Sequence, residues 1–195
     1  MYDTDAQQQR RQSRLALLTA LVMLSFATVL ATALAWNRHH IRLGPVIAPR
    51  GWTISFRPPD NWSQPRRVAP GQEDTLIFLE LSDGQVVRSL AVHRAVRPLG
   101  SSPAEYALHR WRELARERFR VPSGQSLLLA PEAPSLADFG DLPGAYLEDV
   151  DHGLIVHTGF DETAAYSMEL VTSTPPIGPR DTQLVQNVVD SVTVR

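Results

Sequence analysis

The sequence TLIFLELSDGQVVRSLAVHRAV (residues 75–96) contains two apolar runs joined by a two-residue turn. Asp83-Gly84 is a strong hairpin signal, because both central residues of such a turn need a positive φ. The first run, residues 75–81, is apolar on both faces for most of its length, which is typical of a central strand. The second run, residues 86–96, should return as its antiparallel partner. A two-residue turn also predicts two pairs that face each other across the strands, Leu81 with Val86 and Ile77 with Leu90.

A helix is expected after this hairpin. Ser102-Pro103-Ala104-Glu105 offers a capping Ser, a Pro in the first turn and a Glu three residues after the Ser, which together form a capping box. Val121-Pro122 should end the helix. Apolar side chains at helical spacing predict a buried stripe of Tyr106, Ala107, Trp111, Leu114 and Ala115. The outer face should carry Arg110, Arg112, Glu113, Arg116, Glu117, Arg118 and Arg120, either as a solvated surface or as a docking surface for an anionic partner.

Further strands and a second helix are expected on either side of these elements. Trp52, Ile54 and Phe56 alternate with polar residues, which is the pattern of a half-buried strand. Later strands should lie at residues 125–130, 145–150, 154–160 and 165–172, with Asp151-His152-Gly153 as a second hairpin turn. A last helix, residues 180–191, should bury Leu184, Val185, Val188 and Val189. The sequence therefore predicts an α+β fold, an antiparallel sheet of about six to seven strands with two helices.

Three segments share a pattern with a known group of domains. They are the opening GWTISFRPPDNW (residues 51–62), the helix from Tyr106 to Trp111 after a hairpin, and the closing NVVDSVTV (residues 187–194). Together they resemble the PsbP/Mog-like fold, whose members include DcrB-like and LpqN-like envelope proteins. The resemblance implies a non-enzymatic accessory or binding domain that assists a larger assembly, and it supplies no catalytic residues. It is an architectural likeness, and fold does not determine function.

The N-terminal region contains LALLTALVMLSFATVLATALAW, which runs from Leu15 to Trp36 without a charged residue. As a helix it would cover roughly 33 Å, enough to cross the ~30 Å hydrocarbon core of a bilayer. We therefore expect one transmembrane helix between a short basic tail (residues 1–14) and a linker (residues 37–49). A cleaved signal peptide is the alternative, because Ala33-Leu34-Ala35 fits a small-x-small cleavage site. The apolar run is, however, longer than the ~7–15 residues of secretory signals.

The arginines on the two sides of this span leave its orientation open. Arg10, Arg11 and Arg14 precede it, and Arg38, Arg42 and Arg50 follow it. The positive-inside rule counts such residues, and here the counts are equal. The closer spacing of the three arginines on the tail favours a cytoplasmic tail and an extracytoplasmic domain at the cell membrane.

Composition limits the nature of the region after the linker. Residues 50–195 have the length of one ordinary domain, and the chain has no Cys, which excludes disulfides and thiolate metal sites. Residues 50–120 hold twelve Arg against eight acidic residues, whereas residues 121–179 hold nine acidic residues and no Arg. This asymmetry can orient a domain toward a charged partner. The arginines are not clustered as a nucleic-acid-binding patch would require, so no nucleic-acid partner is expected.

Residues capable of metal binding or catalysis are present without a recognisable arrangement. Imidazole and carboxylate groups suit divalent metals, and the candidates Asp149, Asp151, His152 and His157 lie close in sequence. The first three surround a tight turn, and His157 lies several residues away on a strand, opposite Leu147 or Glu148. His93 and His109 have no acid partner identifiable from spacing, and no nucleophile elbow or phosphate-binding loop is present. We therefore expect no cofactor and no enzymatic activity.

These observations favour a single-pass, membrane-anchored binding or accessory domain that contacts or stabilises another membrane or envelope protein. Its partners would be the lipid bilayer, through residues 15–36, and that protein. The candidate contact residues are Trp62, next to Pro58-Pro59, and Arg112 and Arg116 on the helix. Two alternatives remain, a small-ligand or divalent-metal-binding envelope domain that uses residues 149–157, and an unrecognised hydrolase.

Overall fold

The computed structural model describes residues 41–67, 74–122, 131 and 133–195, together with Met23, Ser25 and Thr28. The chain divides into two compact units, Met1–His40 and Ile41–Arg195. The predicted span falls in the first unit and, apart from Met23, Ser25 and Thr28, lies outside the described residues. In the part of the chain that the structure describes, no helix is long and apolar enough to cross a membrane.

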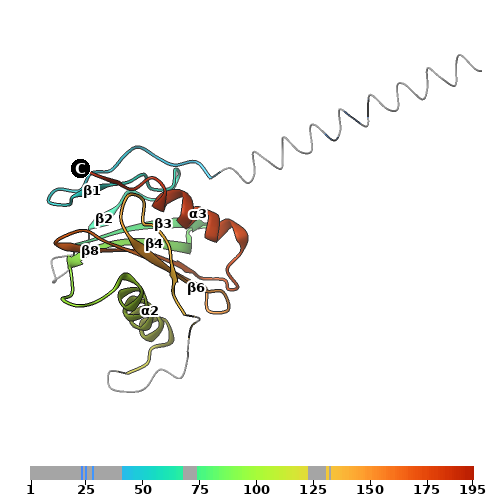
Figure 1. Ribbon diagram of the computed structural model, residues 1–195. Helices are drawn as coiled ribbons and strands as arrows, with labels where there is room; N and C mark the ends of the chain where they lie inside the picture. The colour runs from blue at the N-terminus through green and yellow to red at the C-terminus, as the bar shows by residue number, and fades with distance from the viewer. Residues whose placement is uncertain are drawn as a thin grey trace, which may run out of the picture. The chain divides into compact units, whose positions relative to one another are not determined.

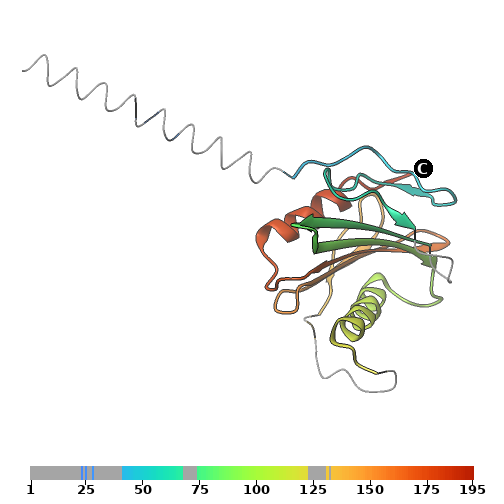
Figure 2. The same ribbon diagram turned by 180° about the vertical axis from the view of Figure 1, so that it is seen from behind.

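The second unit is α+β, as predicted, and is built on an antiparallel sheet. Within the described residues this sheet has seven strands in the order β2-β3-β4-β8-β7-β6-β5. Their bounds are β2 Arg66–Arg67, β3 Asp74–Ser82, β4 Gln85–Val96, β5 Ser135–Leu136, β6 Gly144–Asp149, β7 Leu154–Phe160 and β8 Ala164–Thr172. Figures 1 and 2 show α2 (Pro103–Phe119) on one face of the sheet and α3 (Pro179–Val189) on the other.

The hairpin at Asp83-Gly84 is confirmed, but the position of its first strand is not the predicted one. Asp83 and Gly84 have φ values of 51° and 78°, and Leu81 faces Val86 as expected. A bulge between Glu80 and Leu81 shifts the register, so Ile77 faces Ala91 where Leu90 was predicted. Among the described strands β3 is second from the edge rather than central, with the two-residue strand β2 beyond it. Its apolar residues are therefore less buried than those of β7 and β8.

The segment around Trp52 forms a shorter strand than the alternation predicted. β1 is Ile54–Ser55, and it pairs with β9 (Thr193–Val194) in a separate two-stranded sheet. Trp52, Ile54 and Phe56 are all buried, as the alternation predicted. Part of the expected linker belongs to this unit, since Ile47 pairs with Phe56. The strand expected at residues 125–130 lies outside the described residues.

The helix α2 begins at the predicted capping box. The side chain of Ser102 accepts a hydrogen bond from the backbone N–H of Glu105 at 3.2 Å, and the Glu105 carboxylate accepts one from the backbone N–H of Ser102 at 2.8 Å. The predicted stripe is confirmed for Tyr106, Ala107, Trp111 and Ala115, whereas Leu114 is half-buried. Arg110, predicted on the outer face, is instead buried in the same stripe. α2 packs on β6 and β7, through a cluster that includes Trp111, Leu147 and Val156.

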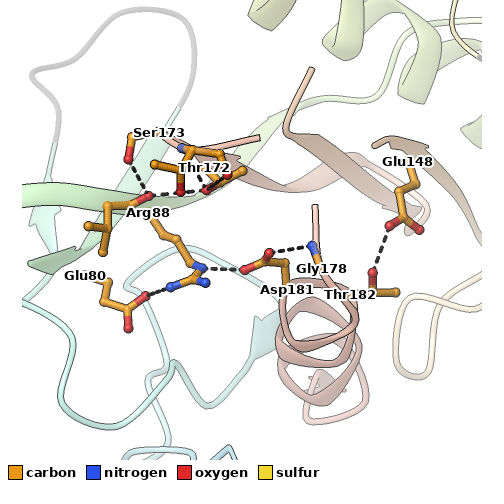
Figure 3. A network of polar contacts seen from close by, with 10 residues as sticks. Glu80, Arg88, Glu148, Thr172, Ser173, Gly178, Asp181 and Thr182 are labelled. Atoms are coloured by element: carbon orange, nitrogen blue, oxygen red, sulfur yellow. Dashed lines mark hydrogen bonds and ion pairs between the residues drawn. The ribbon is translucent and has the colours of Figure 1, made fainter. Parts of the chain in front are cut away.

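The helix α3 covers the larger core on the other face. Its four predicted aliphatic side chains are buried against residues of β4, β7 and β8 and of the segment around Trp52. Polar contacts fix its first turn, as Figure 3 shows. Arg88 of β4 pairs with Asp181 and, at 2.6 Å, with Glu80, while Thr182 donates to Glu148 of β6 at 2.8 Å. α2 lies mainly over β6 and β7 and reaches β8 through Tyr106 and Arg110. Among the described residues no helix covers the same face of β3 and β4.

Candidate binding groove

A groove lies where α2 leaves the sheet uncovered, and we call it the α2 groove. Its volume is about 1290 Å³. The floor is formed by alternate residues of three neighbouring strands, because every second side chain of a strand lies on the same face of the sheet. These residues are Thr75 and Ile77 of β3, Ser89, Ala91 and His93 of β4, and Glu169 and Val171 of β8. The wall is formed by the second half of α2 and the two residues after its cap, and includes Arg110, Leu114, Arg116, Glu117, Arg118 and Arg120.

The buried carboxylate of Glu169 is the centre of the floor. Glu169 is 1% exposed, and its oxygens accept hydrogen bonds from Arg110 Nε at 2.6 Å, Arg110 Nη2 at 3.2 Å and Ser167 Oγ at 2.8 Å. His93 Nε2 lies 2.9 Å from the same carboxylate. Burial alone would raise the pKa of Glu169, but the hydrogen bond and charge of His93, followed by those of Arg110, lower it to about 2. Glu169 is therefore ionised across the physiological range, and its charge is compensated inside the protein.

His93 connects this carboxylate to a hydroxyl. Thr75 Oγ1 lies 2.8 Å from His93 Nδ1, on the far side of the imidazole ring from Glu169. An ionised carboxylate can only accept hydrogen bonds, so His93 Nε2 carries a proton and donates a hydrogen bond to Glu169. In the neutral form of the ring Nδ1 has no proton, and it accepts a hydrogen bond from the Thr75 hydroxyl. Sequence spacing could not indicate this partner, since Glu169 is remote in the chain and reaches His93 only through the pairing of β4 with β8.

Arg110 completes what we call the buried charge cluster, which consists of Glu169, Arg110 and His93. Besides its two bonds to Glu169, Arg110 pairs with Glu113 at 2.8 Å, and it is 7% exposed. The sequence did contain a signal for its burial, because residues 106, 107, 110 and 111 follow the spacing of one helical face. A charged residue within such a stripe needs a buried partner of opposite charge. Glu169, the one acid in the apolar strand β8, is that partner.

Three arginines at the end of the wall, which we call the rim arginines, are arranged differently. They are Arg116, Arg118 and Arg120, and among the described residues none of them has a carboxylate within ion-pair distance. Arg116 and Arg120 are exposed and one helical turn apart. Cations at the C-terminal end of a helix are favoured by its dipole, which explains their tolerance there. In the α2 groove the buried charges are therefore paired with one another and the rim is positively charged, with Glu117 as the unpaired exposed acid among the described residues.

The candidate metal ligands do not meet at one point. His152 Nδ1 lies 2.7 Å from Asp149, whose other oxygen accepts from Trp111 Nε1 at 3.0 Å, and Asp151 is exposed. His157 faces Tyr146, not Leu147 or Glu148, and is buried on the opposite face of the sheet against the Phe139 and Tyr146 rings. Within the described residues no group of three or more His, Asp or Glu side chains could hold a metal ion.

The candidate partner contacts are also separated. Trp62 is half-buried and packs against the core on the α3 face of the sheet. Arg112 and Arg116 are both exposed on α2, on the other face, and only Arg116 lines the α2 groove. Trp62 thus lies where a residue covering the core would lie, while Arg116 lies at an open surface.

Comparisons with protein-family models and with curated proteins find no match to this chain. The buried charges of the α2 groove satisfy one another, and its exposed cations and half-buried apolar residues remain available. Such a surface is suited to holding another molecule.

Proposed function

We propose that this protein is a non-enzymatic accessory protein whose domain, Ile41–Arg195, binds another membrane or envelope protein. The observation that supports this function is the α2 groove, in which buried charges are internally paired while the rim arginines lack carboxylate partners among the described residues. Interaction sites commonly combine an apolar surface with charged residues at the edge. The resemblance of residues 51–195 to PsbP/Mog-like domains supports the same proposal, because such domains mostly assist larger assemblies.

The proposal includes an anchor formed by residues 15–36. The support is the sequence itself, an uncharged run long enough to cross a bilayer and ending in Trp36, an aromatic residue suited to the headgroup level. A tether confines the domain to a thin layer and raises its effective concentration for partners in the same membrane. A modest affinity of the groove would then be sufficient for stable association.

Cross-linking in intact cells tests this function. A photoreactive amino acid is placed at Glu117, which is exposed at the groove, and in a matched variant at Gln183, which is exposed on α3. We expect position 117, and not position 183, to yield a reproducible adduct with one membrane or envelope protein, identified by mass spectrometry. The adduct should disappear when residues 15–36 are deleted. Equal adducts from both positions, or none from position 117, would overturn the proposal.

A hydrolase is the second candidate, because Thr75, His93 and Glu169 follow the hydroxyl–imidazole–carboxylate order of a nucleophilic triad. Arg110 argues against it, since it neutralises the carboxylate that would support a charged imidazole. Turnover of p-nitrophenyl esters by the purified chain, lost in Thr75→Val and His93→Gln variants, would transfer the assignment to this class.

The metal-binding alternative has Asp149 and His152 as its close pair. Calorimetric titration with Zn²⁺ examines it directly. Heat that is present with the unaltered chain and lost in Asp149→Ala and His152→Ala variants would favour a metal site at this hairpin.

A further inference from the structure

We propose that the occupant of the α2 groove is an acidic segment of the partner protein that also carries aliphatic side chains. This inference rests on the proposed function and adds the chemistry of the partner. Three features of the groove support it: the sign of its uncompensated charge, the apolar part of its floor, and its size.

The uncompensated charge is positive. Glu169 and Glu113 both pair with Arg110, and His93 also contacts Glu169. Even with His93 neutral, the groove lining holds four arginines against three carboxylates, so its net charge is positive. What remains at the wall is the three rim arginines against Glu117, none of which forms an ion pair with another described residue. Arginine presents a planar fork of donors that matches a carboxylate, so carboxylates are the expected complement. Arg116 lies in the last turn of α2, and Arg120 is the C-cap residue four positions later. Two neighbouring arginines can each take one carboxylate of an extended segment, in which side chains on the same face are about 7 Å apart.

The floor beneath these arginines is partly apolar. Ile77 faces Ala91 across β3 and β4, Val171 lies on the same face two residues along β8 from Glu169 and faces Ser89, and Leu114 of α2 lies at the wall. All four are half-buried rather than covered. Aliphatic side chains placed there would remove apolar surface from water on both partners. A ligand with carboxylates alone would leave this part of the groove unused.

The size and shape favour a polypeptide segment over other anions. At about 1290 Å³ the groove exceeds the ~300–1,000 Å³ of ordinary small-molecule sites. Its apolar floor lies in a hollow between a helix and a sheet, where the flat surface of an anionic bilayer does not reach. The acidic segment is therefore the occupant that uses both the rim arginines and the floor.

Selection of peptides on the intact protein tests the inference. The full chain, in nanodiscs of neutral phosphatidylcholine, is panned against a random twelve-residue peptide display library. We expect the selected peptides to be enriched in Asp and Glu together with Leu, Ile or Val. A representative synthetic peptide should bind about tenfold more weakly to an Arg116→Gln/Arg120→Gln variant, since exposed ion pairs contribute modestly and two are lost. Leu114→Ser should also weaken binding, because it removes an apolar side chain from the wall of the groove.

Arg112→Gln is the matched control, because Arg112 is exposed on the same helix but does not line the groove. Its affinity should stay within about twofold of the unaltered chain, as for a surface charge outside the contact. Basic or neutral selected peptides, no enrichment, or equal weakening by Arg112→Gln would overturn the inference. Binding to phosphatidylserine vesicles that requires Arg116 and Arg120, without acidic peptides being selected, would assign the rim arginines to a lipid surface and also overturn it.

The peptide selection and the cross-linking at position 117 can succeed or fail independently of each other. A specific adduct at position 117 without acidic selection would leave the accessory role in place and refute the chemistry assigned to its partner. Acidic selection without any adduct would support the chemistry of the groove and refute the cellular role.

Discussion

Replacing Arg110 by Met tests whether the buried charge cluster holds α2 on the sheet. The change keeps an unbranched apolar stem but removes the hydrogen bonds of 2.6 and 3.2 Å that the guanidinium donates to Glu169. Glu169 is 1% exposed, so in the folded protein its carboxylate depends on donors supplied by other side chains. Removing one partner of a buried pair costs about 3–5 kcal/mol. Because His93 and Ser167 still contact the carboxylate, we expect a loss of ~3 kcal/mol in the free energy of unfolding, at the lower end of that range.

Urea denaturation at neutral pH, followed by circular dichroism, measures this loss as a lower midpoint at unchanged slope. Arg112→Met is the matched control, because Arg112 is exposed on the same helix, and it should change stability by no more than ~0.5 kcal/mol. The double variant Arg110→Met/Glu169→Met replaces the ion pair by apolar contacts and should be more stable than Arg110→Met alone. A loss below ~1 kcal/mol for Arg110→Met, or a double variant less stable than the single one, would refute the role assigned to the cluster.

Three further predictions concern the domain. Burial lowers the pKa of His157 to about 4, so as the pH falls the unfolded chain takes up a proton on this residue before the folded chain does. The free energy of unfolding should therefore fall by up to ~3 kcal/mol between about pH 6.5 and pH 4. His157→Leu should flatten this part of a pH-dependent denaturation series. A fragment that begins at Ile41 should melt cooperatively in calorimetry, and at a higher temperature than one that begins at Gly51. The reason is that the shorter fragment lacks Ile47, which pairs with Phe56. Equal melting temperatures for the two fragments would contradict this prediction. Gly140→Ala should lower the free energy of unfolding by more than ~2 kcal/mol, because the added Cβ would lie 2.2 Å from the carbonyl oxygen of Val192. Gly84→Ala should lower it by ~1–2 kcal/mol, because Gly84 has a positive φ but open space around it. Equal losses for the two variants in chemical denaturation would contradict this prediction.

The features that could be predicted from sequence are those that neighbouring residues determine. The capping box at Ser102, the positive φ values at Asp83-Gly84 and the buried face of α3 each depend on a few consecutive residues. The bulge after Glu80 could not be predicted, because it depends on how β3 fits the twist of its neighbours. The position of β3 near the sheet edge could not be predicted either, because a strand that is apolar on both faces has the same sequence pattern whichever element covers those faces.

The candidate site was less accessible to sequence reasoning because it depends on pairing between remote strands. Glu169 reaches His93 across the β4–β8 ladder and Arg110 from the helix above, and no local spacing relates these three residues. One part of it was predictable, since Arg110 lies within the apolar stripe of its helix. The separation of His157 from Asp149 is also a consequence of period two, because Asp149 faces Leu154 and His157 is three residues further along β7.

Hydrogen exchange of the full chain, with and without the partner captured by cross-linking, tests the central claim most directly. We predict that binding protects backbone amides in the second half of α2 and in β3 and β4, the elements that form the α2 groove. We expect no added protection in α3 or β1, which lie on the other face of the sheet. Protection confined to α3 and β1, or unchanged exchange in α2, would contradict the claim.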